Sequence, residues 1–129
     1  MNRSTVKAVA VAPLALGPVS LSAQSRSPLF GSLSPGAQEA RLNQVAYSLL
    51  RSDRRPDAIV VFRKIVEVHP GSSNAHDSLA EALEAAGDKA EAILVTRKGL
   101  EVLEREHLPE ARRQQVRDAL DGRLRQLAP

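Results

Sequence analysis

Residues 39–72, EARLNQVAYSLLRSDRRPDAIVVFRKIVEVHPGS, are followed directly by residues 73–106, SNAHDSLAEALEAAGDKAEAILVTRKGLEVLERE. The second segment repeats the first at an offset of 34 positions, and no gap is needed to keep the two in register. The matched positions include Val45 with Leu79, Ala46 with Ala80, Leu49 with Leu83, Ala58 with Ala92 and Ile59 with Ile93. A period of about 34 residues is typical of helix–turn–helix repeats, so the sequence predicts two such units.

Hydrophobic spacing predicts four helices in these two units. Apolar residues at intervals of three and four positions mark one face of a helix. That spacing occurs in residues 42–49, 58–66, 79–86 and 92–103. We therefore expect an all-α fold in which residues 34–106 form a short α-solenoid.

Capping residues and turn residues predict where these helices begin and end. The expected starts are Ser34 with Pro35, Pro56, Asn74 with Asp77, and Asp88 with Glu91. Serine before proline is a favoured N-cap, and an acid three residues after Asp88 completes a capping box. Pro70-Gly71 should end the second helix and Gly87 the third, because proline cannot continue a helix and glycine permits the turn.

A fifth helix is predicted at residues 109–127, within a capping segment at residues 107–129. Its expected apolar face comprises Val116, Ala119, Leu120, Leu124 and Leu127, flanked by Arg112, Arg113 and Arg123. A terminal helix with one polar face would close a helical stack, and arginine stems can cover apolar surface. The alternative is a basic helix that binds a membrane or nucleic acid, but the acids among the arginines favour the cap.

The first 23 residues resemble a secretory signal peptide. Arg3 and Lys7 precede a short apolar run, and small residues lead to an expected cleavage after Ala23. A mitochondrial presequence or a disordered tail is the alternative. The run is too short for a transmembrane helix, which needs about 20 apolar residues, so no stable membrane span is expected. Residues 24–33 are rich in Ser, Gly and Pro and are predicted to be a flexible linker.

Export would place the mature chain in the periplasm or outside the cell. Cleavage removes 23 of the 129 residues, including two basic ones, and leaves 16 basic and 15 acidic side chains. A nearly neutral chain is a poor candidate for binding nucleic acid, which requires clustered positive charge.

The repeat resembles the tetratricopeptide repeat over residues 39–106. The family motif falls on Val45-Ala46, Leu49, Ala58, Phe62 and Pro70 in the first unit, and on Leu79-Ala80, Leu83, Gly87-Asp88, Ala92 and Leu100 in the second. Alanine at the helix crossings lets two antiparallel helices approach closely. The chain departs from the family pattern at Leu42 and His76, where tryptophan is frequent, and at Thr96 and Glu104.

A narrower resemblance concerns residues 42–50 and 74–82. They are similar to the repeat tails that follow catalytic domains in some exported serine hydrolases of the β-lactamase-like and α/β-hydrolase kinds. This resemblance implies an alternative function, that of a detached tail accessory to an enzyme.

The sequence offers little for catalysis. It has no cysteine, which excludes a thiol nucleophile and cysteine metal sites. Ser4 and Lys7 fit the S-x-x-K motif of serine β-lactamases, but they lie in the predicted signal peptide without the other family motifs. The three histidines, His69, His76 and His107, do not share one helix face, so surface or packing roles are favoured over a metal site. We expect a non-enzyme without cofactor or metal.

The resemblance implies a binding groove, because the first helix of each family unit lines a concave surface. The residues that it places there are Asn43, Tyr47, Leu50, Arg51, Asn74, Asp77, Glu81 and Glu84. Tyr47 would be an aromatic contact beside an acidic wall that prefers neutral or basic extended segments. The alternatives are that this surface is a solvated helix face and that Tyr47 belongs partly to the core.

The leading hypothesis is therefore a non-catalytic protein–protein interaction module that binds a protein or peptide. Repeat proteins of this kind usually need about three or more units, because each unit buries its apolar face against its neighbours. With two units and one further helix, a homo-oligomer or docking onto a larger partner would cover the open end near Ser34.

Overall fold

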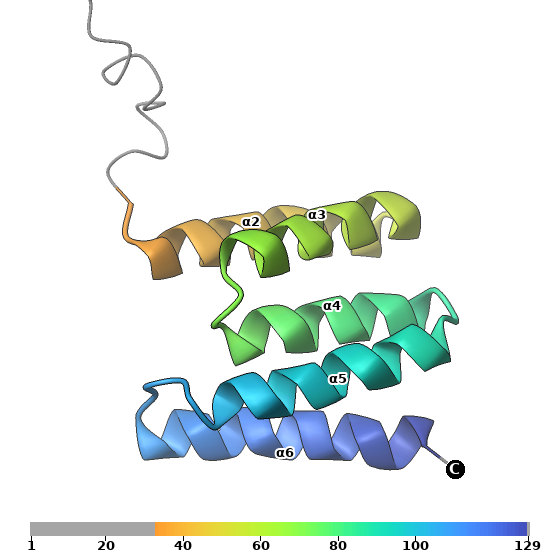
Figure 1. Cartoon of the computed structure of the whole chain (residues 1–129). Helices are drawn as coiled ribbons and strands as arrows, with labels where there is room; N and C mark the ends of the chain where they lie inside the picture. Colours follow the sequence, from red (N-terminus) through yellow and green to blue (C-terminus); the bar gives the residue numbers. More distant parts are fainter. Residues whose placement is uncertain (1–32, 129) are drawn as a thin grey trace, which may run out of the picture. The chain divides into compact units, whose positions relative to one another are not determined.

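The computed structural model describes residues 33–128, and this part of the chain is all-helical (Figure 1). Its helices are α2 (Pro35–Arg51), α3 (Arg55–Val68), α4 (Ser73–Ala85), α5 (Lys89–Leu103) and α6 (Glu110–Leu127). Residues 33–128 contain no strand, so the predicted all-α fold is confirmed. The predicted signal peptide, the S-x-x-K motif and residues 24–32 of the predicted linker lie outside the described residues.

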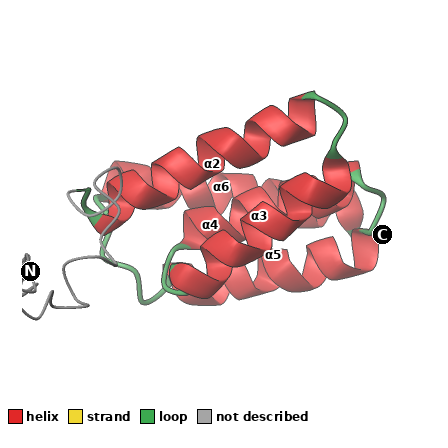
Figure 2. Cartoon of the chain, turned by 90° about the horizontal axis from the view of Figure 1, so that it is seen from above, coloured by secondary structure: helices red, strands yellow, loops and turns green. Residues whose placement is uncertain are grey.

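The helices stack in chain order as a short solenoid-like array. Each helix packs against the next one, and α4 also contacts both α2 and α6. The alternate helices α2, α4 and α6 therefore form one side of the array, whereas α3 and α5 lie on the other (Figure 2).

Small residues allow the close helix packing that the repeat predicts. Ala46, Ala58, Ala80 and Ala92 are all 0% exposed. Phe62 is also completely buried and belongs to the same core cluster as Ala46, Ala58 and Ala92. Burying a large aromatic beside methyl-sized neighbours removes much apolar area from water, which is the main stabilising contribution to such a hairpin.

Most of the predicted helix ends are confirmed. Ser34 accepts a 3.3 Å hydrogen bond from the Ala37 amide, and Asp88 accepts a 3.1 Å bond from the Glu91 amide. Helix α3 begins at Arg55 with proline in its first turn, and its cap residue makes no side-chain cap bond. Gly87 adopts a φ of 83°, a conformation that glycine reaches without steric cost, and it follows the end of α4.

The predicted start of the third helix is wrong. Helix α4 begins at Ser73, and its N-cap is Ser72, whose Oγ accepts a 3.1 Å hydrogen bond from the Ala75 amide. Asn74 lies inside the first turn of the helix. Ser72 directly follows the Pro70-Gly71 turn. The residue at the point where the chain enters the helix is therefore a serine, which is a favourable N-cap.

Helix α6 closes the array at the end opposite α2. Val116, Leu120 and Leu127 are buried, but Ala119 is exposed, so the apolar face is narrower than expected. Polar contacts supplement this face. Arg113 donates hydrogen bonds to the backbone carbonyls of Leu103 and Glu106, which fixes the irregular link between α5 and α6.

Candidate functional site

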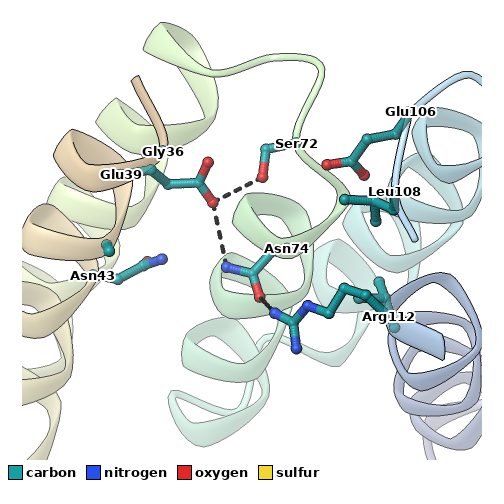
Figure 3. A pocket seen from close by; sticks show the side chains of 10 residues that line it. Gly36, Glu39, Asn43, Ser72, Asn74, Glu106, Leu108 and Arg112 are labelled. Carbon is teal, nitrogen blue, oxygen red and sulfur yellow. Dashed lines mark hydrogen bonds between the residues drawn. The ribbon is translucent and has the colours of Figure 1, made fainter. Parts of the chain in front are cut away.

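A cleft of about 450 Å³ opens where the N-terminal ends of α2 and α4 meet α6 (Figure 3). It is lined by Gly36, Glu39, Ala40, Asn43, Ser72, Asn74, Glu106, Leu108, Arg112 and Val116. The alternating arrangement of the helices brings these residues together, because the three helices of one side all start near the same end of the array.

A chain of hydrogen bonds crosses the cleft from α2 to α6. Glu39 Oε1 accepts bonds from Ser72 Oγ at 2.8 Å and from Asn74 Nδ2 at 3.3 Å. Asn74 Oδ1 in turn accepts a 3.0 Å bond from Arg112 Nη2. Figure 3 shows the Asn74 amide between the carboxylate and the guanidinium. One amide of α4 thus connects an acid of α2 with a base of α6.

Two further polar groups complete the cleft. Glu106 Oε2 accepts a 3.0 Å hydrogen bond from the Ser73 amide and a second bond from the Ser73 hydroxyl. Asn43 lies beside Glu39 on α2, and its Oδ1 atom is buried without a hydrogen-bond partner in the described part of the chain. A buried amide oxygen without a partner carries an energetic cost, and Asn43 bears this cost at the edge of the cleft.

Tyr47 lies further along α2 and is partly a core residue. Its hydroxyl donates a 2.7 Å bond to Glu81 Oε2 and lies 3.2 Å from Ser78 Oγ. Its ring meets Phe62 edge-on, with centroids 5.0 Å apart. Burial and the nearby Glu81 carboxylate raise the pKa of Tyr47 to about 12. Tyr47 therefore contributes to the packing of α2 against α3 and α4.

The acids predicted on α4 differ in their partners. Asp77 and Glu84 both bind Arg123 of α6, whose side chain is only 13% exposed. Burial raises the pKa of Asp77, and the Arg123 guanidinium opposes this shift. Glu81 is exposed and binds Tyr47. Asp77 and Glu84 therefore share the single positive charge of Arg123, which offsets their negative charge only in part.

The remaining predicted groove residues lie away from the cleft. Arg51 is exposed in the last turn of α2, at the opposite end of that helix, and Leu50 packs against the core. The structure thus brings Asn43 and Asn74 together in the cleft, and places Tyr47, Asp77, Glu81 and Glu84 along the same side of the array.

Sequence reasoning missed Glu39, Glu106 and Arg112. The position of Arg112 could have been inferred from the repeat. If residues 109–127 are treated as the first helix of a third unit, the first turn of that helix should lie beside the first turns of α2 and α4. Glu106 could not be anticipated, because it lies in the irregular link.

The residues in 33–128 contain no group of three or more His, Asp or Glu placed to hold a metal ion. None of the helices in this range combines the length and the hydrophobicity that a membrane span requires. His76 is buried, with its Nδ1 2.8 Å from the Ser72 carbonyl oxygen.

No protein-family model matches the chain, and comparisons with curated proteins and with solved structures give no significant match.

Proposed function

We propose that this chain is a non-catalytic, tetratricopeptide-like interaction module that binds an extended segment of a partner protein on the side formed by α2, α4 and α6. The observation that carries the proposal is the convergence of polar side chains from three successive helices of this side on one open cleft. Binding clefts typically place a few polar groups on a rigid frame, which fixes the orientation of the ligand.

The chemistry of the cleft suits a polypeptide backbone. An extended segment presents N–H donors and carbonyl acceptors that need partners when they leave water. Arg112 offers N–H groups beyond those it uses within the chain, and the Asn43 side chain is also part of the lining. The apolar side chains of Leu108 and Val116 line the same cleft and supply nonpolar contact.

The Ser72 hydroxyl in the cleft caps the N-terminus of α4, and this structural use favours a binding role over catalysis. Ser72 Oγ accepts the Ala75 amide as an N-cap and donates to Glu39. Both interactions hold Ser72 in place as a structural group. A serine nucleophile would need a basic partner that activates it and an open path to substrate.

The proposed place of action is an exported compartment, on the basis of the signal-like residues 1–23. Expression in a bacterial host followed by mass measurement of the chain in the periplasm or medium tests this. A mass that lacks the first 23 residues supports export, and a full-length chain retained in the cytoplasm contradicts it.

Peptide binding is tested with an array of extended peptides and the purified chain. Arg112→Ala and Asn43→Ala should weaken binding of any captured peptide, whereas Arg97→Ala, on exposed surface of α5, should leave it unchanged. Circular dichroism checks that all variants stay folded. If no peptide binds the wild-type chain, or if Arg97→Ala has the same effect as Arg112→Ala, the proposed function fails.

A serine hydrolase is the second candidate partner. Both cleft asparagines, Asn43 and Asn74, lie in the two segments that resemble hydrolase tails. Mixing the chain with exported serine hydrolases that lack such a tail tests this role. Increased activity or heat resistance of the enzyme, lost with Asn43→Ala, supports it.

A further inference from the structure

We infer that the cleft selects segments that carry a basic side chain close to an acidic one, with the basic group bound by Glu39 and the acidic group by Arg112. The inference rests on the proposed function, because it assigns a chemistry to the segment that the cleft receives. It follows from charges that the fold leaves unbalanced at this place.

Glu39 and Arg112 have no ion-pair partner in the part of the chain that the structure describes. Elsewhere in that part, arginines on several helices are paired, among them Arg63 with Glu91 and Arg123 with Asp77. In the cleft, the Asn74 amide stands between the two opposite charges, donates to Glu39 and accepts from Arg112. The amide therefore holds both groups in place without neutralising either of them.

Each charged group keeps bonding capacity toward the cleft. Both hydrogen bonds to Glu39 use Oε1, and Oε2 has no hydrogen-bond partner among residues 33–128. Arg112 uses one N–H on each of two nitrogens, for Gln115 and Asn74. A guanidinium carries five N–H donors, so three remain for a carboxylate. Charge-assisted bonds of this kind are stronger than neutral ones, so a ligand with complementary charges would be favoured.

The position of the basic group of the ligand follows from the partners of the other acids on this side of the array. Asp77 and Glu84 are paired with Arg123, so a basic side chain of the ligand gains less there. Glu106, which accepts only from the neutral groups of Ser73, adds a second unpaired carboxylate at the cleft. The basic group of the ligand is thus directed to the cleft end of the surface.

Short extended peptides that contain one Lys and one Asp test the inference. The two residues are placed adjacent or up to about three residues apart, which covers the span of an extended chain across the cleft. Matched peptides replace Lys by Gln or Asp by Asn. Fluorescence anisotropy with the purified chain should detect a Lys/Asp peptide whose affinity falls about tenfold or more on either replacement.

Variants of the chain identify which group binds which charge. Glu39→Gln retains an acceptor for Ser72 and should weaken binding of the Lys/Asp peptide but not of its Lys→Gln counterpart. Arg112→Gln should do the same for the Asp of the peptide. Glu39→Lys should reverse the preference, so that a peptide with Glu in place of Lys binds better. Glu101→Gln and Arg97→Gln, on exposed surface of α5, are the matched controls and should have no effect.

The outcomes separate this inference from the proposed function. If peptides bind regardless of their Lys and Asp, and Glu39→Gln changes nothing, the charge assignment is overturned while peptide binding stands. If a Lys/Asp peptide binds but Glu101→Gln weakens it as much as Glu39→Gln does, the assignment to Glu39 is also overturned. If no peptide binds the wild-type chain, both proposals fail.

Discussion

Tyr47 and Glu81 occupy the same position in the two repeated units, 34 residues apart, and the tyrosine hydroxyl donates a 2.7 Å hydrogen bond to the glutamate. The equivalence in sequence thus becomes a contact in space, because equivalent positions of α2 and α4 lie side by side. A repeat would usually place the same residue type at both positions. Here the two positions differ, and the difference makes them complementary.

Ionisation of Tyr47 should be shifted to high pH in the folded chain. Its pKa is about 12, against 10.0 for an ordinary tyrosine, because burial and Glu81 disfavour the phenolate. Tyr47 is the single tyrosine and there is no tryptophan, so ultraviolet absorbance reports this group alone. Denaturant should return the midpoint to near 10.0. Between these two values the unfolded state releases its proton first, so the free energy of unfolding should fall as pH rises.

Tyr47→Phe should destabilise the fold by about 0.5–1.5 kcal/mol. The ring contact with Phe62 remains, whereas the hydroxyl contacts with Glu81 and Ser78 are lost. Urea unfolding followed by circular dichroism measures the change. An unchanged midpoint would mean that these hydrogen bonds are fully replaced by water.

Gly99→Ala should destabilise the fold by about 1–3 kcal/mol, although alanine favours helices. A Cβ atom there would lie 3.1 Å from both His76 Cβ and Leu120 Cδ2, so the added methyl would push α4 and α6 away from α5. Gly122→Ala is the matched control within α6, because its nearest neighbour would be Arg125 at 3.8 Å. That variant should stabilise the chain by about 0.5–1 kcal/mol, and equal effects of the two changes would contradict the packing argument.

Arg123→Met should loosen α6 and lower the free energy of unfolding by about 1–3 kcal/mol. The change leaves Asp77 and Glu84 close together and without their common partner. Hydrogen exchange of the α6 amides should quicken. Arg117→Met removes an exposed pair with Glu104 and should leave the stability nearly unchanged, so it serves as the control.

Ser72→Ala should cost about 0.5–2 kcal/mol, because it removes the N-cap bond to the Ala75 amide. It also removes a donor to Glu39. Asn74→Ala tests the discarded sequence prediction and should cost less, since Asn74 caps no helix. Thermal unfolding of both variants gives the order, and a larger loss for Asn74→Ala would contradict the assignment of the cap.

The fold was predictable because its signals are local or repeat along the chain. The period of 34 residues, the apolar spacing and the caps at Ser34 and Asp88 each depend on neighbours in sequence. The start of α4 was misplaced for a local reason as well: Ser72 and Asn74 are both favourable N-caps, and the turn before them decided between the two.

The cleft was only partly predictable because it forms only when α6 packs against α4. Asn43 and Asn74 follow from the two units, but Glu39, Arg112 and Glu106 meet them only after α6 has packed. The same packing brings Arg123 to Asp77 and Glu84. A pairing across 46 positions between an arginine and an aspartate leaves no periodic trace in the sequence.

The two ends of the helical array differ in a way that affects how it could be lengthened. Val45 on α2 is 53% exposed, whereas the outward residues of α6, such as Gln114 and Asp118, are polar and bond to one another. A helical hairpin added before α2 in the sequence could pack against the exposed apolar surface of α2 and bury it. Grafting one after α6 would bury hydrophilic side chains, so an engineered longer array should be extended from the α2 end.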